Sequence, residues 1–340
     1  TAHRGGIAYH ARKVTLSAWN LARLTLMRLR TANVYFVPDG GAGIWISVLY
    51  AVVFSLKARG AIVVHHRNAS FVRSRHPAIA MISRVLSDRA QHVFLEREMK
   101  DRFAQLYGEG ADGMVLRNAA TCDVEPSHAG LQPPHQHVTV GYLSNLNRDK
   151  GFDVVASTFE TLAAEDPHLR FALAGPPTSA EARITLDRLI GVLGTRLHYA
   201  GSVSGSSKTE FFRGVDVFVF PTRFRQEAQP NVLYEAMASG CSIVSTAHAL
   251  IPHMLDDAPH TLVPLVESRL VSATTEAVRE EVNMMIEVST RMRRKASAVA
   301  AFVRIRRQAS YAYEGLLDVL SVGCTTPAYE KHRRPSAGPM

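Results

Sequence analysis

Strand-like and helix-like segments alternate regularly over the second half of the chain. Residues 153–164, 180–193, 208–213 and 231–238 have helical periodicity. Between them lie short runs rich in β-branched and aromatic residues, each ending in a loop with Gly, Pro or Ser; the runs are His137–Leu143, Arg170–Ala174, Leu197–Ala200, Val215–Phe220, Ser242–Thr246 and Thr261–Val263. This pattern constrains the fold, because alternating strands and helices build a parallel sheet with helices on both faces. The sequence therefore predicts a Rossmann-like domain.

A second α/β domain is predicted before this one. Four further strands, separated by helices, lie at 33–38, 61–65, 92–95 and 113–116. The segment Glu125–His135 has linker composition, with three prolines and one glycine. A chain of 340 residues is long enough for two domains of ordinary size. We predict an N-terminal domain at 1–130, a C-terminal domain at 131–325 and a disordered tail at 326–340.

Composition predicts a globular protein, with 46% hydrophobic and 20% charged residues. The longest nearly apolar run, Ile44–Leu56, is shorter than the roughly 20 residues of a membrane span, so we expect a buried helix there. The Arg-rich first 30 residues do not match a secretory signal. Three scattered cysteines, Cys122, Cys241 and Cys324, form neither a disulfide framework nor a zinc spacing. These features predict a cytoplasmic location.

Positive charge is concentrated in the first part of the chain. Residues 1–125 contain 17 Lys and Arg against 9 Asp and Glu, whereas residues 126–340 contain 22 against 21. Such asymmetry favours a surface that meets phosphates, and a solvated basic face is the alternative. No base-reading motif is present, so nucleic acid is not expected as a partner. A helix over Val14–Arg30 has a partial apolar stripe; it is either an ordinary domain helix or one that lies on an anionic membrane, at its inner face.

The loops after the strands are where an α/β sheet binds ligands. After Val215–Phe220 comes a loop with Glu227, then Gln229, Pro230 and a helix that begins at Asn231 and carries Glu235. The start of a helix offers amide donors and the positive end of its dipole. An anionic ligand is therefore predicted at the residues around Gln229–Val232.

Glu227 and Glu235, followed by Ala-Met-Ala-Ser-Gly240, resemble the Glu-x7-Glu signature of glycosyltransferase family 4. Its companions occur in the expected order: Lys150-Gly151, Ala174-Gly175-Pro176, Tyr199-Ala-Gly201 and Asp216–Pro221. The resemblance covers residues 137–265 well and the first domain more loosely. It implies the GT-B fold, in which two Rossmann-like doubly wound domains face a central cleft. It also implies a retaining transferase that moves a sugar from a UDP- or GDP-sugar to a glycan or lipid-linked acceptor.

The resemblance also implies roles for individual residues. Glu235 would accept hydrogen bonds from both ribose hydroxyls, and Glu227 would face the transferred sugar. Lys150 and the amides around Gln229, Pro230, Asn231 and Val232 would neutralise the diphosphate, with Gly175 and Gly201 beside the donor. No metal or cofactor is then expected, and no Asp-x-Asp triplet is present. In the first domain, a family histidine at a strand end matches His65-His66, with His66 slightly favoured.

Two departures from the family pattern leave alternatives open. Where the family often has an Arg before the phosphate-binding Lys, this chain has Asn145, so Arg148 would have to replace it or phosphate binding would be weaker. The usual opening strand and Gly-rich loop are not found, which predicts a first domain shortened at its N-terminus; the glycines of 40–43 are weak evidence for a phosphate site. A nucleotide-sugar-binding remnant without turnover and a nucleotide-sugar epimerase are the alternative functions.

Overall fold

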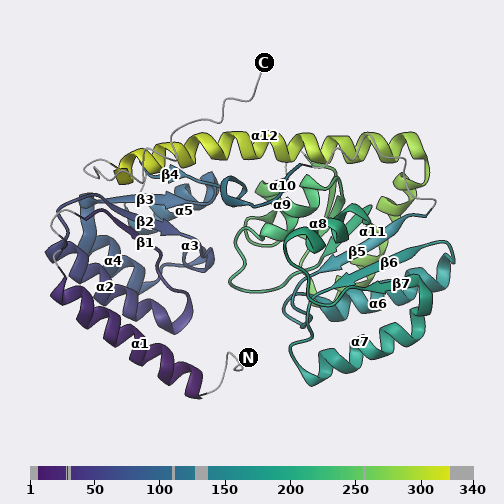
Figure 1. Ribbon diagram of the computed structural model, residues 1–340, viewed down its shortest axis with the longest axis horizontal. Helices are drawn as coiled ribbons and strands as arrows, with labels where there is room; N and C mark the ends of the chain where they lie inside the picture. Colours follow the sequence, from purple (N-terminus) through teal and green to yellow (C-terminus); the bar gives the residue numbers. More distant parts are fainter. Residues whose placement is uncertain are drawn as a thin grey trace. The chain divides into compact units, whose positions relative to one another are not determined.

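The computed structural model describes residues 7–27, 29, 32–108, 112–126, 137–255 and 258–321. The chain divides into two compact units (Figure 1). The first unit is Thr1–Leu116 together with Tyr311–Met340, and the second unit is Arg117–Ser310. Most of the predicted linker and the whole predicted tail lie outside the described residues.

The second unit contains the predicted parallel sheet. Its strands are β5 (Thr139–Leu143), β6 (Arg170–Ala174), β7 (Leu197–Tyr199), β8 (Val217–Phe220), β9 (Ser242–Thr246) and β10 (His260–Val263). They are ordered β10-β9-β8-β5-β6-β7, and every pairing is parallel. Each predicted strand of this sheet is present, with ends within two residues of the prediction.

Helices cover both faces of this sheet. They are α6 (Phe152–Glu165), α7 (Ala180–Leu193), α8 (Gly205–Arg213), α9 (Asn231–Ala238), α10 (Ile251–Leu255), α11 (Leu270–Ile286) and α12 (Val288–Ser321), with short 3-10 turns η3 (Asn118–Thr121), η5 (Gly194–Arg196) and η6 (Glu267–Arg269). Figure 1 shows α6 and α7 on one face and α8 to α10 on the other. This follows from right-handed crossovers that run in opposite directions from the centre of the sheet.

The strand order reverses between β5 and β8. After β5 the chain moves toward β6, and after β8 it moves toward β9, so the loops that follow these neighbouring strands diverge. Ligands of open α/β sheets bind at such a switch point, outside the carboxyl ends of the strands. The loops at 144–151 and 221–230 therefore occupy the position in the second unit where a ligand is expected.

Arginine and lysine side chains of α12 are anchored in the second unit. Lys295 Nζ lies 3.0 Å from Asp216 Oδ1 and donates to Val215 O at 3.0 Å. Arg294 pairs with the buried Glu281. Buried charges need partners of this kind, because desolvation otherwise costs several kcal/mol. The Arg-rich sequence of this helix thus serves packing in part, and the predicted helical region after Thr275 is resolved into α11 and α12.

The first unit has a smaller sheet. Strands β1 (Val34–Phe36), β2 (Ile62–His66), β3 (Ala90–Phe94) and β4 (Met114–Val115) pair in chain order and in parallel. Around them lie α1 (Ile7–Leu26), η1 (Gly41–Gly43), α2 (Ile44–Lys57), α3 (Ser70–Arg73), α4 (Pro77–Leu86), η2 (Ser87–Arg89) and α5 (Arg97–Tyr107). Two parallel α/β sheets are the architecture of the GT-B fold, and this prediction is confirmed.

The end of α12 belongs to the first unit, although the sequence prediction assigned residues up to 325 to the second domain. Asn33 Nδ2 donates to Leu320 O at 2.7 Å. The Met114 side chain approaches Gly315. These contacts join residues far apart along the chain. Because α12 is one continuous helix, no local sequence pattern marks the residue at which it passes from the second unit to the first.

The helix expected to be buried at 44–56 is only half buried. Ile44, Val48, Ala51 and Phe54 of α2 are in the core, while Trp45, Leu49, Val52 and Leu56 are exposed by 50, 51, 37 and 76%. On α1, Ala18 is exposed and Leu21 and Leu24 are half buried, while the side chain of Val14 lies outside the described residues. Residues 28 and 30 are likewise not described.

Substitution of Gly175 tests the packing of the loops after β5 and β6. Gly175 has φ +117°, and a Cβ there would lie 1.8 Å from Ser144 O. We expect Gly175→Ala to lower the free energy of unfolding by about 2 kcal/mol or more, because both the backbone conformation and the contact oppose a side chain. Gly191→Ala, in α7 with nothing within 4 Å of its Cβ position, should instead stabilise by about 0.5–1 kcal/mol. Urea unfolding of both variants measures the difference, and equal effects would contradict this account.

Candidate functional site

Lys150 and Glu227 meet at the switch point of the second unit. Lys150 Nζ lies 2.6 Å from Glu227 Oε2, and the two side chains are exposed by 20 and 10%. Thr222 Oγ1 donates to the same carboxylate oxygen at 3.3 Å. The ammonium group also lies 4.5 Å from the centre of the Phe224 ring. The structure thus brings these two predicted site residues together on the second unit.

The backbone around Lys150 explains why the two loops come together. Lys150 N donates to Asn147 Oδ1 at 2.9 Å, and Lys150 O accepts from Tyr142 of β5 at 3.0 Å. Gly151 follows with φ +81°, and a Cβ there would lie 2.2 Å from Pro221 O. Only glycine allows this approach without displacement. In the Lys-Gly pair recognised in the sequence, Lys150 supplies the positive charge. Gly151 then lets the loop after β5 pack against the loop after β8.

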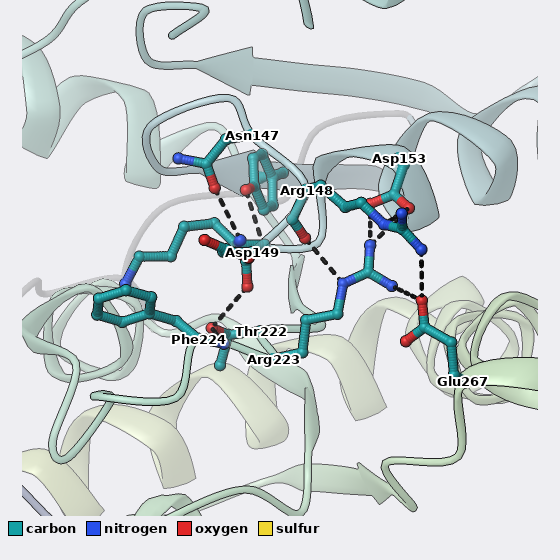
Figure 2. A network of polar contacts seen from close by, with 10 residues as sticks. Asn147, Arg148, Asp149, Asp153, Thr222, Arg223, Phe224 and Glu267 are labelled. Atoms are coloured by element: carbon teal, nitrogen blue, oxygen red, sulfur yellow. Dashed lines mark hydrogen bonds and ion pairs between the residues drawn. The ribbon is translucent and has the colours of Figure 1, made fainter. Parts of the chain in front are cut away.

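A polar network beside the pair holds the same two loops (Figure 2). Arg223 Nη1 lies 2.7 Å from Glu267 Oε1, and its Nη2 pairs with Asp153. Arg223 Nε donates to Arg148 O at 2.8 Å, and Arg223 N donates to Asp149 O at 2.9 Å. Burial acts to lower the pKa of Arg223, but the hydrogen bonds that its guanidinium donates to Asp153 and Glu267 outweigh it and raise the pKa above its ordinary value.

Arg148, a predicted donor-binding residue, is engaged in this network. Its Nη2 donates to Glu267 Oε1 at 3.0 Å, and its side chain is 70% exposed. The pKa of Glu267 is lowered by its hydrogen bonds to Arg223 and Arg148. Asn145, in the same loop, is exposed. Because Glu267 engages Arg148 and the Asn145 side chain is exposed, the structure brings together only part of the predicted set of phosphate-binding residues.

Glu235 forms a second ion pair, with a residue that the sequence analysis did not select. Lys208 Nζ of α8 lies 2.7 Å from Glu235 Oε1 of α9, with side-chain exposures of 32 and 13%. Both residues line a cavity of about 890 Å³, together with Asn231. No local signal links Lys208 to Glu235, because α8 follows the edge strand β7 and α9 follows β8, and two strands of the sheet lie between β7 and β8.

The start of α9 lies between the two ion pairs in the sequence. Pro230 is the N-cap and Asn231 the first helical residue. The buried Gln229 accepts from Asn118 N with Oε1 and from Asn118 Nδ2 with its carbonyl, both at 2.9 Å. This fixes the helix start against η3. The first amides of a helix, here those of Asn231 and Val232, have no partner inside the helix and favour an anion.

The two predicted glycines have different surroundings. Gly175 N donates to Gly201 O at 2.7 Å, which joins the loops after β6 and β7. Gly175 has Ser144 O against its Cβ position, whereas Gly201, at φ +65°, has nothing within 4 Å. Gly175 therefore allows the loops after β5 and β6 to pack together, whereas the space beside Gly201 is not filled by other residues.

His65 and His66 lie in the core of the first unit. They are exposed by 4 and 1%. His66 Nε2 lies 2.8 Å from His92 Nδ1, and the His66 ring stacks on Phe94. His65 Nδ1 pairs with the Tyr35 hydroxyl. In this arrangement neither ring offers a surface to a ligand, so the donor-facing role of His66 stays a prediction that needs this core to open.

Residues 137–283 match the family model described as glycosyl transferases group 1. The matched segment contains Lys150, Lys208, Glu227 and Glu235. None of the curated proteins matches the sequence of the chain.

Solved structures share the fold at low sequence identity. Anabaena HepE in complex with UDP is 16% identical, covering 91% of this chain and 82% of its own, with a TM-score of 0.64. Trehalose 6-phosphate synthase from Burkholderia multivorans is 16% identical over 99% of this chain and 79% of its own, with a TM-score of 0.64. Staphylococcus aureus TarM is 12% identical over 80% of this chain, which spans 58% of the TarM chain, with a TM-score of 0.55.

Acid should destabilise the first unit through its buried histidines. Burial lowers the pKa of His65 and His92 to about 4, and burial together with His92 lowers that of His66 well below its ordinary value. The unfolded chain therefore binds more protons, so stability is complete above pH ~6.5 and is lost as pH falls toward about 4. We expect the Tm to fall over that range, and His66→Leu with His92→Leu to flatten the profile. His168→Gln, at an exposed position, should leave it unchanged; an equally steep profile in the double variant would contradict this assignment.

Proposed function

We propose that the chain is part or all of a retaining glycosyltransferase of family 4, which moves a hexose from a nucleotide-diphosphate sugar to a glycan or lipid-linked acceptor. The observation that carries this proposal is the pair of partly buried glutamates on either side of the α9 N-terminus. Each is matched with a lysine, at 2.6 Å for Glu227 and 2.7 Å for Glu235. The family match over this segment supports the same conclusion.

The second unit would bind the donor. Glu235 accepts hydrogen bonds from the ribose hydroxyls, since an ionised carboxylate has two oxygens that only accept. The Asn231 and Val232 amides and Lys150 neutralise the diphosphate. Because these groups supply the positive charge, no metal or other cofactor is proposed. HepE with UDP and TarM with UDP support a uridine nucleotide as donor.

Glu227 and Lys150 would act on the reacting bond. The bond between the anomeric carbon and the diphosphate oxygen breaks, and the acceptor oxygen bonds to that carbon on the same face. Its proton passes to the departing diphosphate. Lys150 stabilises the charge that develops on the diphosphate, and Glu227 opposes the positive charge on the sugar. The ion pair between them holds both groups in place before the donor arrives.

Glu227→Gln should separate this function from its alternatives. We expect at least about a 100-fold loss of kcat in transfer or donor hydrolysis with UDP- and GDP-sugars, because charge opposing the transition state is removed. Glu235→Gln should mainly raise the donor KM, and Glu181→Gln, at an exposed site of α7, should change neither. Turnover unaffected by Glu227→Gln would exclude the proposed role.

The same assays test the alternative functions. An epimerase would convert the donor without any acceptor, which product analysis by NMR detects. A binding remnant would be stabilised by UDP or GDP in thermal shift, with no turnover on any donor.

An anionic membrane surface is proposed as a partner of the first unit, which would place the enzyme peripherally at the inner face of the membrane. Trp45, Leu49, Val52 and Leu56 recur along one stripe of α2 and are exposed. Trp19 of α1 is 68% exposed, and Arg23 one turn on is also exposed. The described part of the chain has no helix long and apolar enough to cross a bilayer. An exposed apolar stripe on α2, and an exposed Trp with a cation one turn away on α1, suit binding at the interface of an anionic bilayer.

Vesicle sedimentation tests this surface. The protein should bind vesicles of phosphatidylcholine that contain roughly 30% phosphatidylglycerol, which supplies the anionic charge. Binding should weaken at high salt, which screens this attraction. Trp45→Ser with Leu49→Ser should weaken binding several-fold. Ile184→Ser, at a 69% exposed apolar position of α7, is the control. Equal loss in both variants, or unchanged binding in the first, would contradict the assignment.

A further inference from the structure

Lys208 occupies a place in the second unit that the donor-binding residues do not account for. It is the fourth residue of α8, and its ammonium group lies 2.7 Å from Glu235 Oε1. Glu235 is the carboxylate expected to receive the ribose. The cavity that both line measures about 890 Å³ and extends along Gly205, Ser206 and Asn231. A lysine therefore stands where a sugar hydroxyl would arrive.

The position of Lys208 is fixed by the start of its helix. Ser204 and Ser207 form a capping box, with Ser204 N donating to Ser207 Oγ at 3.1 Å. Such a box satisfies amides at the helix start and holds the first turn. Helix α8 packs against α9, which carries Glu235. The lysine thus reaches the carboxylate from a held backbone, and its side chain is two-thirds covered.

The hydrogen-bonding capacity of the pair is not used up by the contact between its members. An ammonium group has three donors and no acceptor, while a carboxylate accepts through two oxygens. A hydroxyl can donate to the carboxylate and accept from the ammonium at the same time. The neighbouring Cys122 does not compete for Lys208, since burial raises the pKa of its thiol to about 12 and it stays neutral.

We propose that Lys208 is a specificity-determining residue that makes this cavity selective for ribose over deoxyribose. A ribose hydroxyl lies between the two side chains, donating to Glu235 and accepting from Lys208. A 2′- or 3′-deoxy nucleotide leaves both charged groups without that partner, which is costly in a partly buried site. This inference rests on the proposed function, because it requires a nucleotide in the cavity.

Titration calorimetry with UDP, GDP and their 2′- and 3′-deoxy forms tests the role of Lys208. The wild-type protein should bind the ribonucleotide at least about tenfold more tightly than one deoxy form, as expected for a hydrogen bond to charged groups. Lys208→Met should reduce that ratio toward the value for Glu235→Gln, and Lys208→Arg should retain part of it. Arg213→Met removes the same charge from the same cavity wall and should leave the ratio unchanged.

The double variant Lys208→Met with Glu235→Gln distinguishes recognition from packing. If the two side chains act on one hydroxyl, the double variant should keep a ratio of ribonucleotide to deoxyribonucleotide affinity at least as high as that of Glu235→Gln alone. A purely structural pair would change the Tm of the variants and leave the ribose to deoxyribose ratio as in the wild type.

Two results would overturn the inference while leaving the donor site standing. The first is that Lys208→Met keeps the wild-type ratio of ribonucleotide to deoxyribonucleotide affinity. The second is that Lys208→Met binds the ribonucleotide more tightly than the wild-type protein does, which would make Lys208 a competitor of the ribose. Absence of binding of every nucleotide to the wild-type protein is a different result, because it removes the proposed donor site and this inference together.

Discussion

The loops after β5 and β8 approach each other so closely that Gly151 has no room for a side chain. A Cβ at that position would lie 2.2 Å from Pro221 O. β5 and β8 are neighbours in the sheet but are separated by three intervening helices and two strands in the sequence. Their contact brings Lys150 to Glu227, and the chain directly after Glu227 leads into the start of α9. The site in the second unit follows from this approach.

Charge pairing determines how the residues around this contact are held. Lys150–Glu227 and Lys208–Glu235 are partly buried, whereas the Arg148–Glu267 contact is largely exposed. Exposed pairs of that kind contribute little to stability, while removing one member of a buried pair leaves an uncompensated charge. The two lysine–glutamate pairs are therefore organised before a ligand binds. They also place both signs of charge where a nucleotide sugar would present hydroxyls and phosphates.

The first unit makes different use of its polar residues. His65, His66 and His92 are enclosed by aromatic rings and by one another, and their environment lowers their affinity for protons. A histidine pair at the end of a strand is compatible with a ligand site and with a buried core, because both place the ring beside a sheet. The apolar run at 44–56 predicted a buried helix. Several of its apolar side chains instead lie on the exposed face of α2.

The sequence by itself determined the strands of both units and most helices of the second unit, although it predicted neither α10 nor the first turn of α8. Periodicity located β6, β9, α7 and α9 to the residue, because strand and helix patterns are local properties. The motif around Glu227 and Glu235 likewise identified the acidic residues and the glycines of their loops. Tertiary structure alone decided which charges meet: Lys208 with Glu235, Arg223 with Asp153 and Glu267, and Gln229 with Asn118. These partners lie 27 to 111 residues apart, and only the packing of strands and helices brings them together.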